Sequence, residues 1–112
     1  MSKDFVITAE NNQKEFRHDV LKENAVTYRF DFTPWVEFNN TVSSVVWNVE
    51  SGQGVITGEA LASNVASALV TFPEEGQTRI KLTATTGTEV YVTQLNVKVT
   101  DPNTIELLGD YQ

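Results

Sequence analysis

Apolar and polar residues alternate along most of the chain between positions 41 and 100, in short runs separated by Gly, Asn or Pro. A period of two places successive side chains on opposite faces of a strand, so each run has one apolar and one polar face. The runs read, in order, TVSSVVWNVE, GVITGEA, VASALVTF, TRIKLTATT and EVYVTQLNVKVT. Short alternating strands of this kind predict an all-β fold, a single antiparallel, immunoglobulin-like β-sandwich of about seven strands.

A further strand begins at Ala25, where the same alternation starts, and it ends at Pro34, because proline cannot donate to a strand ladder. Its apolar face carries Val26, Tyr28, Phe30 and Phe32. In the later runs, Trp47 shares an apolar face with other inward residues, and Tyr91 is also assigned inward. We therefore expect Trp47 to be the core tryptophan of the sandwich.

The two ends of the chain lack this alternation. In the first 23 residues, Phe5 to Thr8 could form an edge strand, and the spacing of Phe16 and Val20 favours one or two helical turns within 13–24. We interpret residues 1–23 as an arm that lies on its own sandwich or on a neighbour. The predicted organisation is an N-terminal arm (1–23), the sandwich (24–101) and a C-terminal tail (102–112).

Charge and composition exclude several classes of protein. The 112 residues contain no cysteine, so there is no disulfide framework and no thiolate metal site. Eight basic residues are scattered among fifteen acidic ones, giving a net charge of −7 that would repel phosphate. No apolar run is long enough for a membrane span or a signal peptide. We expect no nucleic acid, no membrane and no cofactor as partners.

Candidate catalytic groups are few. His18 is the single histidine, whereas a triad needs a base with a nucleophile and an orienting group. It is therefore expected to be a solvated side chain. Glu74 and Glu75 lie in a Pro-Gly turn, where adjacent side chains point apart. The sequence predicts no enzyme, no catalytic residue and no metal site.

Trp35 has two alternative interpretations. It follows Pro34 in a connection that also contains Phe38 and ends at Asn39-Asn40. The residue is either a lid on the core or an exposed anchor, because tryptophan buries a large area with few rotamers.

Four segments together resemble a known group of proteins. They are Tyr28-x-Phe30-Asp31-Phe32-Thr33-x-Trp35, Val42-Ser43-Ser44-Val45-Val46-Trp47-x-Val49-x-Ser51-Gly52, Ala66-Ser67-Ala68-x-Val70-Thr71-Phe72-x-x-x-Gly76 and Ile80-Lys81-Leu82-Thr83-Ala84-Thr85-Thr86. Over residues 25–101 the chain is similar to small immunoglobulin-like or PKD-like structural proteins of tailed bacteriophages. The resemblance implies a many-copy virion protein, assembled in the host cytoplasm, and no catalytic residue is implied.

Capsid decoration is the leading expectation from this resemblance, with the chain clamping major capsid subunits from outside through its terminal arms. The alternatives are a head–tail or tail accessory protein and a carbohydrate-binding appendage. The expected partner is the major capsid protein or another virion protein, and self-association as a dimer or trimer is also open. The interface candidates are Phe5, Ile7, Phe16, Trp35, Phe38, Ile105, Leu107, Leu108 and Tyr111.

Overall fold

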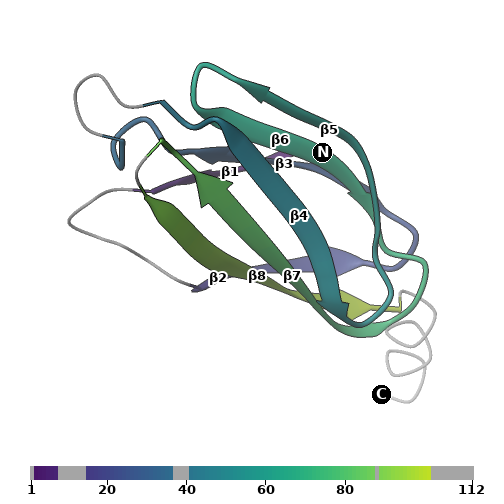
Figure 1. The fold of residues 1–112 in the computed structure, drawn as a ribbon. Coiled ribbons are helices and arrows are strands. Elements are labelled where there is room, and N and C mark those ends of the chain that lie inside the picture. The colour runs from purple at the N-terminus through teal and green to yellow at the C-terminus, as the bar shows by residue number, and fades with distance from the viewer. Residues whose placement is uncertain (1, 8–14, 37–40, 88, 102–112) are drawn as a thin grey trace, which may run out of the picture.

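The structure, a computed structural model, describes residues 2–7, 15–36, 41–87 and 89–101. These residues form eight strands and no helix (Figure 1). The strands are β1 (Ser2–Val6), β2 (Glu15–Leu21), β3 (Ala25–Asp31), β4 (Ser44–Ser51), β5 (Val55–Ala62), β6 (Val65–Thr71), β7 (Gly76–Thr85) and β8 (Val90–Thr100).

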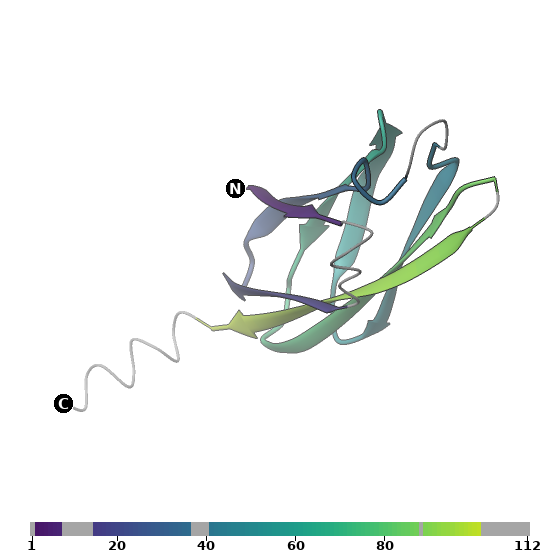
Figure 2. The ribbon, with the colours of Figure 1, turned by 90° about the vertical axis from the view of Figure 1, so that its left-hand side faces the viewer.

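The strands form two four-stranded sheets that face each other (Figures 1 and 2). Sheet I has the order β1-β3-β6-β5, and sheet II has the order β2-β8-β7-β4. The predicted immunoglobulin-like β-sandwich is therefore confirmed. It has one more strand than the seven or so that were expected, and two of its pairings, β1 with β3 and β2 with β8, are parallel.

Of the two alternatives for the N-terminal segment, its described residues lie on the chain's own sandwich. The segment supplies one edge strand to each sheet, β1 to sheet I and β2 to sheet II. The prediction of helical turns was wrong at β2, because a spacing of four also fits a strand of period two. Phe16 and Val20 both face inward and are buried, with His18 between them on the same side.

His18 is half-buried, so the expectation of a solvated side chain was also wrong. Its Nδ1 lies 2.8 Å from the hydroxyl oxygen of Tyr28, which is fully buried. This hydrogen bond joins β2 of sheet II to β3 of sheet I. Burial, and secondly the charge of Lys3, lower the pKa of His18 from 6.5, although Asp19 acts in the opposite direction.

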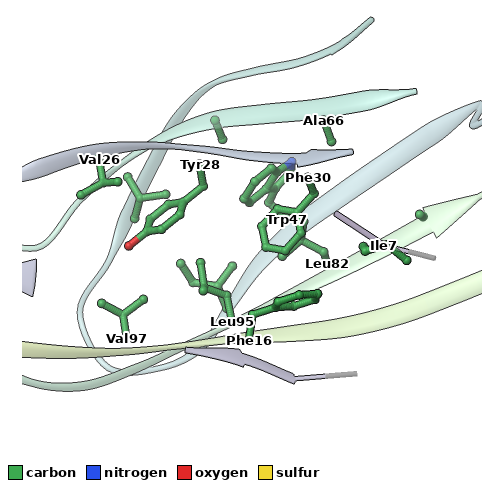
Figure 3. Packing of buried hydrophobic residues seen from close by; sticks show 14 of the residues in the cluster. Ile7, Phe16, Val26, Tyr28, Phe30, Trp47, Ala66, Leu82, Leu95 and Val97 are labelled. Carbon is green, nitrogen blue, oxygen red and sulfur yellow. The ribbon is translucent and has the colours of Figure 1, made fainter. Parts of the chain in front are cut away.

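Aromatic rings fill the space between the sheets. Figure 3 shows Phe30 and Trp47 side by side between the layers, with Phe16 on the side of sheet II. The Phe30 centroid lies 5.7 Å from that of Trp47, 5.5 Å from that of Phe16 and 4.9 Å from that of Phe5. Trp47 is 7% exposed, which confirms it as a core residue. Aromatic rings attract each other at these separations when they lie tilted or edge to face, as these three pairs do.

Two connections position the ends of the sandwich. The β5–β6 hairpin turns at Ser63 and Asn64, both with positive φ, as a tight two-residue turn requires. Asn64 then holds the neighbouring loops, since its backbone oxygen accepts from the Phe32 N–H and its side-chain oxygen accepts from the Val42 N–H. The hairpin thus fixes the point where β3 ends.

Candidate interaction surfaces

The turn after β3 positions Trp35. Asp31 accepts a hydrogen bond from the Thr33 N–H at 2.9 Å, as Asp commonly does at a turn. The backbone N–H groups of Trp35 and Val36 both donate to the carbonyl of Phe32 at 3.0 Å. The chain therefore folds back on the end of the strand, and Trp35 is placed over the core.

Trp35 is a half-buried lid at this end of the sandwich. Its ring centroid lies 5.3 Å from that of Tyr91 and 6.1 Å from that of Phe32. On its outer side, Trp35 lines an open hollow of about 650 Å³ together with Val90 and Val92. The lid interpretation fits these contacts, and a role as an anchor for a partner stays a prediction.

Tyr91 is confirmed as an inward residue, with 6% of its surface exposed. Burial raises the pKa of its hydroxyl, and a hydrogen bond involving Thr93 partly offsets that effect. The phenol is therefore neutral at physiological pH and acts as a packing group beside Trp35.

The outer face of sheet II has an apolar end. Adjacent strands bring Val46, Thr83 and Val92 into one row, and Ser44, Thr85 and Val90 into the next. The exposed fractions of the three valines are 59% for Val46, 64% for Val90 and 40% for Val92. Val90 and Val92 on β8 are separated from Val46 on β4 by the threonines of β7, and Glu15 and Glu89 line the hollow beside Val90 and Val92.

The other half of the same face is polar and rich in basic residues. One row contains Arg17, Asn96 and Arg79, and the next contains Asp19, Lys98 and Gln77. A shallow hollow lies over these two rows. The Nε of Arg79 donates to the Asn96 side-chain oxygen at 3.2 Å, and Arg17 is paired with Glu15 at 3.1 Å.

The outer face of sheet I carries Asp4, Arg29 and Asp31 at its β1 and β3 side. Thr27, Leu69 and Thr57 form one row, in which Leu69 is 39% exposed. Arg29 lies on the same sheet and pairs with Asp4 of β1 at 3.7 Å. This face also exposes Val55 at 53% on β5 and Val6 at 50% on β1, and Asp31 lies opposite Val6.

Three of the predicted interface residues lie in the core of the chain itself. Ile7 is 0% and Phe16 is 6% exposed, and Phe5 is half-buried against the Phe16 and Phe30 rings. These side chains are covered because β1 and β2 close the edges of the two sheets. Ile7 and Phe16 are therefore not available to a partner in the folded chain. The other candidates, Phe38, Ile105, Leu107, Leu108 and Tyr111, lie outside the described residues.

The titratable groups that were considered for catalysis do not come together. His18 is on β2 and bonds to Tyr28, whereas Glu74 and Glu75 are exposed in the β6–β7 turn. Within the described ranges, no three His, Asp or Glu residues are grouped so that they could hold a metal ion. The same ranges contain no helix of the length and apolarity that a membrane span requires.

The apolar end of sheet II was missed in the sequence. Val46 stands next to the inward residues Val45 and Trp47, and Val90 and Val92 flank the inward Tyr91. The sequence did contain an indication of it, because these three apolar residues stand at positions where the alternation predicts outward, polar side chains. Only the register shows that Val46 and Val92 lie in one row, on either side of Thr83.

No protein-family model matches the chain, and no curated protein matches it. Solved structures with a similar fold include a chimeric titin Z1Z2, at 16% identity and a TM-score of 0.55, covering 80% of this chain and 90% of the other. PbICP-C, solved in complex with falcipain-2, has 8% identity, a TM-score of 0.51, and coverages of 88% and 98%.

A 2,6-sialyltransferase from Photobacterium sp. JT-ISH-224 is similar at 14% identity and a TM-score of 0.52. The match covers 86% of this chain, which spans only 18% of the length of that enzyme. At these identities the similarities show the fold alone. They define the chain as an immunoglobulin-like sandwich module.

Proposed function

We propose that this protein is a non-catalytic structural protein of a tailed-bacteriophage virion, which binds other virion proteins on the capsid or on the tail. The observation that carries the proposal is the fold. Residues 25–101, which resemble immunoglobulin-like phage proteins, lie in a sandwich whose interior is filled by aromatic and aliphatic side chains. Such a module offers faces and loop ends for binding.

Capsid decoration is the first version of this proposal. It was expected to use the N-terminal arm as a clamp between major capsid subunits, but Ile7 and Phe16 are buried in the sandwich. Extracting them to reach a capsid would cost the contacts that close both sheets. A decoration role therefore requires the outer faces of the sheets or residues 102–112 to make the contact.

A head–tail or tail accessory role is the second version, and the same observation favours it. A ring of copies needs flat, complementary faces more than a long wrapping arm. Strands β1 and β2 are edge strands of the two sheets and not a free arm, which supports docking by the faces of the sandwich.

A carbohydrate-binding appendage has less support. Sugar binding would require an aromatic ring with a free face, and the candidate rings are Trp35, Phe38 and Tyr91. Trp35 is tilted against Tyr91, which is itself buried. Phe38 lies outside the described residues. A glycan array probed with the full chain should give no hit, and a reproducible hit that is lost in Trp35→Ala would favour this alternative.

Copy counting in purified particles tests the proposal. Quantitative mass spectrometry of particles from the phage that encodes this chain should find it as a stoichiometric component. A capsid-wide coat requires far more copies per particle than a single tail ring, so the ratio to the major capsid protein separates the two versions. Absence of the chain from particles that are infectious and intact would contradict both.

A further inference from the structure

The sandwich has four strand edges, and one of them differs from the other three. β1 and β5 are the outer strands of sheet I, and β2 and β4 are the outer strands of sheet II (Figure 1). Among the described residues, the backbone of each outer strand pairs on one side only. Such an edge can pair with another chain, and folded proteins usually protect it by charged side chains, bulges or short length.

Three of the four edges carry a protecting feature. β1 has only five residues, and two of them are charged. In β2, three of the seven residues are charged. β5 is interrupted at Gly58 and Glu59, where its register with β6 shifts and Gly58 has a positive φ of 62°. Each of these edges is therefore short, charged or irregular.

β4 has none of these features over its first six residues, Ser44–Val49. They pair with β7 in a regular register, and the register shifts only after Val49. None of the six is charged, and four are β-branched or aromatic, the residue types that are enriched in strands. The charged residue of this strand, Glu50, lies at the shift itself. β4 is therefore a regular, uncharged and largely apolar edge.

The apolar side chains of β4 are also incompletely covered. Val45 and Val49 pack against the core but are only half-buried, whereas Ile80 and Leu82 of the neighbouring β7 are 0% exposed. On the outer face of the sheet, Val46 is 59% exposed. Another strand beside β4 would cover part of all three valines, and the removal of apolar surface from water favours association.

The distribution of charge allows two copies to approach along their strand edges. The eight strands hold as many basic as acidic residues, and the residues outside the strands hold nine acidic and two basic ones, which account for the net charge of −7. Repulsion between two copies therefore opposes contact through the loops and chain ends more than contact along an edge. The charged strand residues are Asp4, Glu15, Asp19, Asp31, Glu50 and Glu59, and Lys3, Arg17, Arg29, Arg79, Lys81 and Lys98.

Antiparallel pairing of β4 with β4 of a second copy fits this edge. With a two-fold axis at Val46, the two Val46 side chains lie opposite each other. Val45 then lies opposite Trp47 of the other copy, and Ser44 lies opposite Asn48. Cross-strand pairs of aromatic and β-branched residues stabilise a sheet, and none of these pairs contains a charge.

The same axis separates the acidic residues of the two strands. The two Glu50 residues would be about 27 Å apart at about 3.4 Å per residue, well beyond the Debye length of about 8 Å at physiological salt. The basic residues Lys81 and Arg79 lie on β7, one strand further in, beside Asn48 and Ser51. A two-fold contact uses the β4 edge of both copies, so association ends at two copies.

The size of this contact sets its expected strength. An edge about seven residues long and one sheet deep covers roughly 240 Å², compared with roughly 800 Å² per partner in a standard stable complex. Backbone hydrogen bonds supply most of the affinity when a strand is added to a sheet. We therefore expect a weak dimer, with a dissociation constant between about 1 μM and about 1 mM.

We propose that two copies of this chain associate through their β4 edges, in an antiparallel pair centred on Val46 that joins the two copies of sheet II into one continuous sheet. This inference goes beyond the proposed function and does not depend on it, because it concerns the purified chain alone.

Sedimentation of the purified full chain tests the inference. From about 1 μM to about 1 mM, the average mass should rise from that of one copy toward that of two. Val46→Lys and Val46→Glu should each lower the association constant by roughly tenfold or more, because each places like charges directly opposite one another. An equal mixture of the two variants should associate at least as strongly as the unaltered chain, since opposite charges then meet at the axis.

A matched control lies on the other sheet. Val55 is 53% exposed on β5, the outer strand of sheet I that contacts β4. Val55→Lys should therefore associate as the unaltered chain does. Thermal melts verify that each variant is folded. Association should hold or strengthen from about 50 to about 500 mM NaCl, because salt screens the repulsion between two acidic chains.

Several results would overturn the inference. A chain that stays single at about 1 mM would leave the β4 edge without a second copy. Full association of both Val46 variants, loss of association in Val55→Lys, or assemblies larger than two would place the contact elsewhere. Failure of the mixed variants to associate would contradict an axis at Val46, and weakening by salt would assign the contact to ion pairs. Absence of the chain from phage particles would contradict the proposed function and leave these results unchanged.

Discussion

The β7–β8 hairpin and the two N-terminal strands hold the sandwich together by different kinds of contact. β7 and β8 pair antiparallel over ten residue pairs, from Gly76↔Val99 to Thr85↔Val90. β1 pairs parallel with β3 over five pairs, and β2 pairs parallel with β8 over seven. The hairpin forms the centre of one sheet, whereas the N-terminal strands form one edge of each.

The difference shows how an edge segment can be as necessary as a central one. β1 and β2 are mostly exposed, yet they bring Phe5, Ile7, Phe16 and Val20 against the core. Because β1 is an edge strand of sheet I and β2 an edge strand of sheet II, the loss of both strands would uncover one edge of each sheet. The comparison therefore predicts that stability depends on the N-terminal segment as strongly as on the hairpin.

Deletion of residues 1–21 should have the largest effect. It removes two strands and exposes the inward side chains of β8 and β3, so we expect the truncated chain not to fold cooperatively. Circular dichroism and a thermal melt of the purified chain measure this. Arg17→Gln, which changes only an exposed side chain of β2, is the control and should melt as the unaltered chain does. A truncated chain with an unchanged melting temperature would restore the interpretation of this segment as an arm.

Sequence patterns predict the hairpin and the N-terminal strands unequally, for a physical reason. Ile80, Leu82 and Ala84 alternate with polar residues, and the period of two leaves no other interpretation. In β2 the inward positions are Phe16, His18 and Val20, and the polar residue in the middle hides the alternation. The partner that makes His18 acceptable inside, the Tyr28 hydroxyl, comes from the other sheet. No local pattern contains that information.

The positions of the exposed valines of sheet II also depend on strand pairing, which no local pattern contains. Alternation indicates that Val46, Val90 and Val92 are on the outward phase, but their proximity depends on the register of β4, β7 and β8. Trp35 was given two interpretations, since a connection rich in aromatic residues does not show which way its rings face. The turn bonds to Phe32 decide that it packs on the core.

Substitution of single core residues compares how much the edge strand β2 and the strand β4 each contribute to the core. Trp47→Ala on β4 and Phe16→Ala on β2 should each lower the free energy of unfolding by about 3–5 kcal/mol, because both remove a large buried ring. Val46→Ala, at the exposed position beside Trp47, should change it by less than about 0.5 kcal/mol. Urea denaturation of the three variants gives the values. A loss below about 1 kcal/mol for Phe16→Ala would show that β2 contributes little to the core.

Gly52 tests how closely the connection from sheet II to sheet I packs on β7. Its φ is +85°, and an added Cβ would lie 2.4 Å from the backbone oxygen of Gln77 and 2.7 Å from the Cα of Thr78. Gly52→Ala should therefore cost more than about 2 kcal/mol, as both strain and a backbone clash act. Gly58→Ala, also at positive φ but with no neighbour near its Cβ, should cost only about 1 kcal/mol. Equal losses in urea denaturation would contradict the close packing.

The smallest expected effect is a dependence of stability on pH, and it reports on the contact between β2 and β3. Burial and the Lys3 charge lower the pKa of His18 in the folded chain below 6.5, its ordinary value, which we take for the unfolded chain. The unfolded chain therefore binds the proton more readily, and the stability is fully present above pH 6.5 and declines as pH falls below it. His18→Gln removes this titration, whereas carboxylates titrate alike in both proteins. Urea denaturation at a series of pH values from neutral downward should show the unaltered chain losing more stability than His18→Gln, and parallel curves would mean that His18 is as solvated when folded as when unfolded.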